Sequence, residues 1–178
     1  MDLQNLSDAE LMAQTRRGRH DAFAVLIRRY QRSLVNFFRR MGALHHEAED
    51  LVQETFVRVY SHRKRYAPTG KFSSFLYVVA RHAWADMLRR ASRRPEAKGR
   101  TDAEASVGGG TDRSDARMDV QAALERLSEK LRVVVVLSVY QGLRYREIAE
   151  VLDIPLGTVK SRMHLALRQM EEFLNVGE

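Results

Sequence analysis

The stretch 142–164 contains two helical patterns separated by a tight turn, and it restricts the possible folds more than any other part of the chain. The sequence Asp153-Ile154-Pro155 interrupts the first pattern. Proline is tolerated in the first turn of a helix, where its missing N–H would be unpaired in any case, so a second helix is expected over about 155–173. This outline predicts a helix-turn-helix, in which the second helix enters the major groove of DNA.

The second predicted helix has an apolar face and a polar face. Apolar residues recur at steps of three and four from Val159 to Leu174. The opposite face collects hydrogen-bond donors near the start of the helix, where base edges and phosphates would be met. These donors are Lys160, Ser161, His164 and Arg168, with Arg162 beside them. Because charge, helical phase and motif agree, the pattern favours DNA binding over a helix face that is merely solvated.

The charge balance points to a polyanionic partner. The 178 residues include 30 Lys and Arg against 23 Asp and Glu, which gives a formal net charge of +7 and a pI of about 10.0. Such a balance is typical of proteins that meet nucleic acid or an anionic membrane surface, although a solvated basic face would have the same composition.

The composition also restricts the compartment. The chain has no cysteine, which excludes disulfides, zinc fingers and thiol chemistry and is typical of a reducing compartment. No apolar run approaches the roughly 18 residues of a membrane span. The start Met1-Asp2-Leu3-Gln4 lacks the basic residues and apolar core of a signal peptide. We therefore expect a soluble, cytoplasmic protein that does not insert into a membrane.

Helical periodicity accounts for the first 91 residues. Ser7 and Glu10 have the spacing of a capping box, which predicts a short helix that ends at Gly18. A long amphipathic helix is expected from His20, with Gly42 at its end. Third and fourth helices are expected over about 46–61 and 72–91.

The third predicted helix carries a second stripe beside its core stripe. This stripe consists of Asp50, Gln53, Glu54 and Val57, and it is acidic within an otherwise basic chain. An acidic patch is the wrong surface for DNA but a suitable surface for a basic protein partner. A solvated helix face remains the alternative on the residues alone.

A metal site on this helix is another alternative. His46, Asp50 and Glu54 follow one another at four-residue spacing and could share a face. Zinc helices of the two-histidine kind need a second His at i+4 and an additional ligand, and neither is evident. The residues therefore favour no metal and no cofactor over a metal-dependent enzyme.

The stretch 63–100 is strongly basic and includes aromatic residues on the fourth predicted helix. It holds eleven Lys and Arg against two acidic residues. Tyr77, Arg81 and Trp84 lie on one stripe of that helix, and aromatic residues interleaved with basic ones are typical of single-stranded nucleic-acid binding. The alternative is that Tyr77 and Trp84 belong to the core beside a basic edge.

The remaining segments complete an all-α prediction. Residues 93–118 are rich in glycine and charge and have no aromatic residue, which predicts a flexible linker and a domain boundary. Two further helices are expected over 119–127 and 129–140. The run Val133–Leu137 could be a buried strand, but the chain offers no partner strand.

Several motifs go beyond periodicity. The most specific are AEDLVQETF at 48–56, and EIA at 147–149 followed by GTVKSR at 157–162. Supporting segments are DAF at 21–23 with Tyr30, FSSFLY at 72–77, and Leu124 and Leu127 with Arg132. With these segments in this order, nearly the whole chain outside the linker resembles the bacterial RNA polymerase sigma factors of the extracytoplasmic-function (ECF) type in the sigma-70 superfamily.

The resemblance implies two small helical domains joined by a flexible linker. Residues 1–92 would be sigma region 2, residues 93–118 the linker, and residues 119–178 region 4 with the helix-turn-helix. Such a protein is not an enzyme and needs no cofactor. It is a dissociable RNA polymerase subunit that directs promoter recognition and transcription initiation.

The resemblance also implies partners and site residues. Core polymerase would be contacted through its β′ clamp helices and β flap, and an anti-sigma factor is a further expected partner. Asp50, Gln53, Glu54 and Val57 would bind the polymerase core. The single-stranded −10 element would be held by Arg63, Lys64, Arg65, Lys71, Tyr77, Arg81, His82 and Trp84. The −35 duplex would be read by Thr158, Lys160, Ser161, Arg162, His164, Leu165 and Arg168.

The chain departs from the family pattern at a few positions. Phe75 and His82 stand where Trp and Asn are frequent, which weakens the assignments in the −10 segment. Arg144 stands where a capping Ser or Thr is frequent. A free-standing helix-turn-helix regulator, which would bind duplex DNA tightly without polymerase, remains the rival hypothesis.

Overall fold

The fold is described here from a computed structural model, which covers residues 2–67, 69–93 and 113–175. The described part is helical and contains no strand. The N-terminal half contains η1 (Leu3–Asn5), α1 (Asp8–Arg16), α2 (His20–Met41), α3 (His45–Ser61) and α4 (Phe72–Ser92). The C-terminal half contains α5 (Arg113–Arg126), α6 (Glu129–Val135), the π-helical turn η3 (Val136–Tyr140), α7 (Tyr145–Leu152) and α8 (Leu156–Asn175). The predicted all-α fold class is confirmed.

The helix ends follow the capping signals of the sequence. The Ser7 hydroxyl accepts the Glu10 backbone N–H at 3.3 Å, and the Glu10 carboxylate accepts the Ser7 N–H at 2.7 Å, so the predicted capping box is present. Gly42 ends α2 in the left-handed region at φ 106°, which is costly for a residue with a Cβ. Asp153 ends α7 at φ 52°, a conformation that aspartate tolerates better than most residues.

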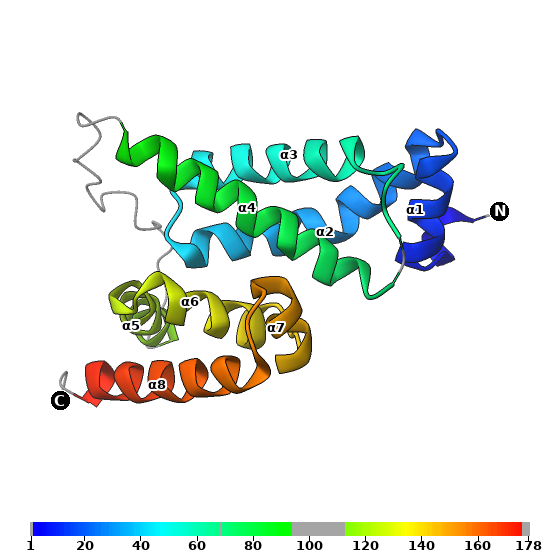
Figure 1. The fold of residues 1–178 in the computed structure, drawn as a ribbon. Coiled ribbons are helices and arrows are strands. Elements are labelled where there is room, and N and C mark those ends of the chain that lie inside the picture. The colour runs from blue at the N-terminus through cyan, green and yellow to red at the C-terminus, as the bar shows by residue number, and fades with distance from the viewer. Residues whose placement is uncertain (1, 68, 94–112, 176–178) are drawn as a thin grey trace.

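The N-terminal domain is built around α2. Its residues Leu26, Leu34, Phe37 and Phe38 are fully buried, as the long amphipathic pattern predicts. The helices α1 and α3 pack against α2, and α4 packs against α3. Figure 1 shows α2, α3 and α4 lying side by side. This packing leaves one face of α3 free for contacts outside the domain.

In the C-terminal domain, α5, α6 and α7 pack against α8, and η3 packs against α6 and α7. Its fully buried side chains include Leu124, Leu127, Leu137 and Ile148. The helix expected over 129–140 is present, but its last turn widens into η3. The Gln141 N–H reaches the Val136 carbonyl at 3.2 Å, five residues back, and this wider ring is the mark of a π turn.

Most of the predicted linker lies outside the described residues, because the structure describes none of 94–112. Its last part differs from the prediction, since α5 begins at Arg113 rather than near Asp119. Within the described ranges, no helix is both long and apolar enough to cross a membrane.

The two domains lie against each other, and Arg132 of α6 joins them. Its guanidinium donates to the Leu124 carbonyl at 2.8 Å and the Leu127 carbonyl at 3.1 Å, which satisfies acceptors near the end of α5. It also donates to the Met41 carbonyl at the end of α2, at 2.7 Å. The left-handed Gly42 leaves room for this contact, because a Cβ there would lie 3.1 Å from Arg132 Nη1.

Replacing Arg132 with methionine is expected to destabilise the protein. The variant keeps an apolar stem but loses donors to partly buried carbonyls, which costs about 2 kcal/mol. For a chain of this size, that loss lowers the unfolding midpoint by about 4–8 °C. Thermal unfolding followed by circular dichroism measures the shift. The exposed Lys130→Met serves as the control, because it removes one positive charge from the same helix, and its expected change is below about 2 °C.

Candidate polymerase and nucleic-acid interfaces

The outward face of α3 carries what we call the acidic surface, which consists of Asp50, Gln53, Glu54 and Val57. The core-stripe residues of the same helix are buried, so the two stripes separate as their spacing predicts. Asp50 and Gln53 are exposed, and Val57 is 64% exposed. An aliphatic side chain beside acceptors suits a partner that presents basic groups around an apolar contact.

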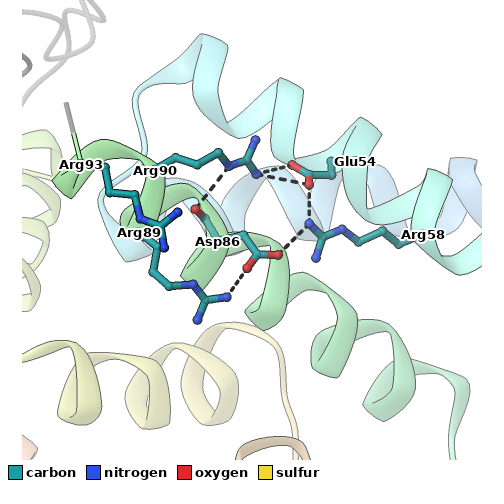
Figure 2. A pocket seen from close by; sticks show the side chains of 6 residues that line it. All are labelled: Glu54, Arg58, Asp86, Arg89, Arg90 and Arg93. Atoms are coloured by element: carbon teal, nitrogen blue, oxygen red, sulfur yellow. Dashed lines mark hydrogen bonds and ion pairs between the residues drawn. The ribbon is translucent and has the colours of Figure 1, made fainter.

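Glu54 differs from the rest of the acidic surface because its carboxylate already forms ion pairs with arginines of the same chain. Its carboxylate pairs with Arg58, one turn along α3, and with Arg90 of α4 at 3.2 Å (Figure 2). Asp86 of α4 joins the same network through Arg58, at 2.8 Å, and Arg89. Hydrogen bonds from Arg58 and Arg89 hold the pKa of Asp86 below its usual range, so this carboxylate is ionised at neutral pH.

This network was not predicted from the sequence. The pairs Glu54–Arg58 and Asp86–Arg89 have helical spacings of four and three, so a search for such pairs would have found them. The link between α3 and α4 through Arg90 could not be found in this way, because it depends on how the two helices pack.

Basic residues of the predicted −10 set gather where α3 ends. Lys64 and Arg65 are exposed just beyond α3. The Arg63 guanidinium lies 3.9 Å from the centroid of the Tyr60 ring and donates to the Tyr60 carbonyl at 2.8 Å. The stacking and the hydrogen bond hold Arg63 in place, while its two neighbours extend into solvent.

The two aromatic residues of the predicted −10 set are buried in this structure. Tyr77 is 2% and Trp84 is 4% exposed. The Tyr77 ring packs on Phe37 of α2 with centroids 5.4 Å apart, and burial raises its pKa to about 12. In this conformation Tyr77 and Trp84 are therefore core residues, as the alternative interpretation predicts.

Arg81 and His82 of α4 are more accessible than the two aromatic residues. Arg81 is half-buried and His82 is exposed. Partial burial and then the charge of Arg81 lower the pKa of His82, so its imidazole is neutral at pH 7. His82 can thus offer hydrogen bonds to a nucleic acid but little charge.

Two residues of the predicted −10 set contact the C-terminal domain, and we call these contacts the closed interface. Lys71 Nζ lies 2.7 Å from Glu147 Oε1 of α7. The Tyr77 hydroxyl donates to Gln141 Oε1 at 2.5 Å. The hydrogen bond from Lys71 is the main cause that lowers the pKa of Glu147, so this carboxylate is ionised at neutral pH. Figure 1 shows α7 against α4, consistent with their packing.

A third contact extends the closed interface along α2. The Arg40 guanidinium lies 4.2 Å from the centroid of the Tyr140 ring and donates to Gln121 Oε1 at 2.8 Å. The domains are therefore joined by aromatic, charged and neutral hydrogen-bonded contacts.

The predicted −35 residues lie on the solvent side of α8. Val159, Met163 and Ala166 are buried on its inner side, which fixes the helical phase. The Ser161 hydroxyl donates to the Thr158 carbonyl at 3.1 Å. The outer side presents donors as a major-groove helix requires. Exposed there are Lys160, Ser161, His164, Leu165 and Arg168, while Thr158 and Arg162 are half-buried.

The metal alternative finds no support in the described part of the chain. No group of three or more His, Asp or Glu side chains comes together there as a possible metal site. His45 pairs with Glu49 at 3.3 Å, and Glu54 is held by arginines. His46, Asp50 and Glu54 therefore do not form the ligand set that the alternative needs.

Comparisons with known proteins match both domains. The family model for Sigma-70 region 2 matches residues 26–94, and the model for Sigma-70, region 4 matches residues 117–170. The ECF RNA polymerase sigma factor SigE of Mycolicibacterium smegmatis is 36% identical over 156 residues, which cover 84% of this chain and 60% of that relative. The ECF RNA polymerase sigma factor SigW of Bacillus subtilis is 32% identical over 166 residues, which cover 85% of this chain and 88% of SigW.

The fold is also similar to solved structures. CnrH, in complex with the cytosolic domain of CnrY, has a TM-score of 0.75 and 25% identity, and the match covers 96% of this chain and 99% of CnrH. The sigma factor RpoE of Bartonella quintana, in complex with the anti-sigma factor NepR, has a TM-score of 0.71 and 23% identity, with coverage of 88% and 98%. Two region matches in the expected order, together with a relative that aligns over most of its length, establish that this chain belongs to the ECF RNA polymerase sigma factors of the sigma-70 family.

Proposed function

We propose that this chain docks on RNA polymerase core through the acidic surface of α3 and directs it to promoters with two DNA-binding surfaces. The observation that carries the proposal is the presence of two unlike surfaces in one chain, an acidic one on α3 and a row of donors on α8. A free-standing DNA-binding regulator would need only the second. Polymerisation belongs to the core enzyme, and the chain itself contributes no catalysis.

The acidic surface is proposed to bind the β′ clamp helices. Asp50 and Gln53 would supply acceptors to basic side chains, and Val57 would supply the apolar contact between them. Glu54 would join them after exchanging its internal arginine partners for basic groups of the polymerase. Opposite charges at such an interface speed association and exclude wrong partners.

The −35 and −10 elements are proposed to be held by different domains. The outer face of α8 would enter the major groove of the −35 duplex, with the β flap of the polymerase supporting this domain. Arg63, Lys64 and Arg65 would hold phosphates of the opened −10 strand. Lys71, Tyr77, Arg81, His82 and Trp84 would complete that site, which requires Lys71 and Tyr77 to leave the closed interface.

A regulatory protein is a further proposed partner, and the cytoplasm is the proposed place of action because RNA polymerase works there. The solved CnrH, whose likeness covers 96% of this chain, is in complex with the cytosolic domain of CnrY, and the solved RpoE is in complex with the anti-sigma factor NepR. By analogy we infer that an anti-sigma factor binds this chain.

Run-off transcription tests the proposed function. The purified chain is combined with core polymerase and a library of genomic fragments, and the transcripts are sequenced. We expect defined start sites that require both the chain and the core. Tight sequence-specific duplex binding by the chain alone, without core-dependent initiation from any fragment, would instead identify a free-standing regulator.

Removing donors from α8 is expected to weaken −35 binding. Lys160→Ala with Arg162→Ala should reduce duplex affinity by about ten- to a hundredfold if one contact is to a base edge. Each lost phosphate contact should also lower the salt slope by about 1. Fluorescence anisotropy at several salt concentrations measures both quantities. The matched control is Arg28→Ala with Arg32→Ala, which removes two exposed charges from α2 and should change affinity less than threefold.

A further inference from the structure

A pocket of about 330 Å³ opens between α3 and α4, next to the acidic surface. Figure 2 shows the six side chains that line it, all of them charged. They are Glu54, Arg58, Asp86, Arg89, Arg90 and Arg93. None of the four arginines belongs to the −10 or −35 sets described above, so the function of this pocket is unassigned.

The arginines of the pocket outnumber its carboxylates by four to two. Glu54 pairs with Arg58 and Arg90, and Asp86 pairs with Arg58 and Arg89. Arg93 has no ion pair with any residue in the described part of the chain. The side chains of Arg89 and Arg90 are 66% and 63% exposed, so they retain donors that face solvent. The pocket therefore has an excess of about two positive charges and several free guanidinium donors.

A phosphate group matches this excess. Guanidinium groups bind phosphate oxygens through two parallel N–H donors, and several of them around one group favour a tetrahedral anion. A carboxylate would present fewer acceptor oxygens, whereas a phosphodiester chain presents singly charged phosphate groups at regular spacing, so that two successive phosphates would balance the excess.

The position of the pocket favours nucleic acid as the source of the phosphate. On α4, positions 82, 86, 89 and 93 follow one another at steps of four, three and four, so they lie on one face of the helix. That face begins at the exposed His82, which belongs to the predicted −10 set. A strand held at His82 could therefore continue into the arginine pocket without leaving α4.

Glu54 occupies part of this pocket and also belongs to the acidic surface. Its two oxygens accept from Arg90 at 3.3 and 3.2 Å and one of them accepts from Arg58. A basic group of a docking partner would compete with these arginines for the same oxygens. Once Glu54 turned toward that partner, Arg90 would lose its carboxylate and Arg58 would keep only Asp86.

We propose that the α3–α4 pocket is a phosphate site for the promoter strand, that Glu54 blocks it in the free protein, and that polymerase docking on Glu54 opens it. The inference rests on the proposed function, because it takes the acidic surface as the polymerase contact. It assigns Arg89, Arg90 and Arg93 to strand binding, and it couples DNA binding to the presence of core enzyme.

The test uses Glu54→Gln in the full chain without polymerase. Glutamine keeps the shape and acceptor of the side chain but removes the charge that neutralises Arg90. We expect affinity for a fluorescent single-stranded oligonucleotide to rise about fivefold, since one half-buried repulsive charge is removed beside a phosphate. Glu49→Gln removes the same charge from an exposed position of α3 outside the pocket and should change affinity less than twofold.

A second set of variants shows whether the gain comes from the pocket. Adding Arg89→Gln and Arg93→Gln to Glu54→Gln should abolish the fivefold increase, with circular dichroism verifying the fold. An unchanged affinity in Glu54→Gln, or an equal rise in Glu49→Gln, would overturn the inference. Because this measurement needs no polymerase, a chain that supports run-off transcription but fails here would refute the pocket alone.

The source of the phosphate is resolved by competition. Pyrophosphate is titrated against the oligonucleotide bound to Glu54→Gln. Failure to displace it at millimolar pyrophosphate, with loss of binding in the arginine variants, supports nucleic acid as the ligand. Displacement at micromolar pyrophosphate would overturn the assignment to the promoter strand in favour of a small phosphoanion.

Discussion

Cross-linking Lys71→Cys to Glu147→Cys is expected to reduce core-dependent run-off transcription to background. The wild-type chain has no cysteine, so a short bismaleimide joins these two positions and no others within the chain. The native side chains already meet there, with Lys71 Nζ 2.7 Å from Glu147 Oε1, so a short spacer spans the introduced thiols. The reagent is applied and removed before core enzyme is added.

The physical reason for this loss is the distance between the promoter elements. They lie about one and a half helical turns of DNA apart, on the order of 50 Å. In the closed structure, α7 rests on α4 and leads directly into α8. A helix of the length of α7 spans about 12 Å. The −35 surface is therefore held too close to α4 for both domains to reach their elements, and Tyr77 stays buried beside Gln141.

Reversible cross-linking provides the control. A spacer that contains a disulfide should restore transcription when it is reduced, whereas each single-cysteine variant should be unaffected by the reagent. Binding of −35 duplex by the cross-linked chain alone should persist, because the outer face of α8 remains exposed. Full transcription by the cross-linked protein would mean that initiation occurs in the closed arrangement.

Charge reversal at Asp50 is expected to have the second large effect. Asp50→Lys should weaken core polymerase binding by about ten- to a hundredfold, or about 1.4–2.8 kcal/mol, because it places a positive charge against basic groups of the partner. Asp50 is a sharper choice than Glu54 because Glu54 is held by Arg58 and Arg90 within the protein. Competition against a labelled sigma factor for core enzyme measures the affinity.

The location of the changed charge distinguishes docking from a general charge effect. Glu171→Lys makes the same change at an exposed position of α8, on the far side of the molecule from α3 in Figure 1. It should leave core affinity within about threefold. Asp50→Lys should also leave −35 duplex binding by the chain unchanged. Equal loss of core and duplex binding in Asp50→Lys would contradict the separation of the two interfaces.

Local signals in the sequence predicted most of the helices. The Ser7–Glu10 capping box, the glycine ends and the three- and four-residue apolar steps act within one or two turns, so they could be recognised without tertiary information. The start of α5 at Arg113 was not predicted, because charged and small residues without a clear apolar stripe give weak helical periodicity. The widened turn η3 was also not predicted, since no residue pattern marks it.

The candidate interfaces were predictable to different degrees. The phase of α3 places Asp50 and Val57 outward, and the phase of α8 places Lys160 and His164 outward, because in each case a single helix determines the face. Tyr77 and Trp84 could not be placed in this way. Their stripe borders the core stripe of α4, and whether it is covered depends on which helices pack beside it.

The sequence by itself determined the all-α fold, the acidic stripe and the DNA-reading helix, since each depends on residues a few positions apart along one helix. The tertiary structure decided which residues of other helices those surfaces contact. Residues 54 and 90 meet in an ion pair, and residues 71 and 147 meet across the two domains. Such contacts join residues far apart in the chain through helix packing, which short-range periodicity does not encode. The helix-turn-helix can therefore be predicted from the sequence. Its contact with α4, and the position of Glu54 in both the acidic surface and the arginine pocket, depend on the folded protein.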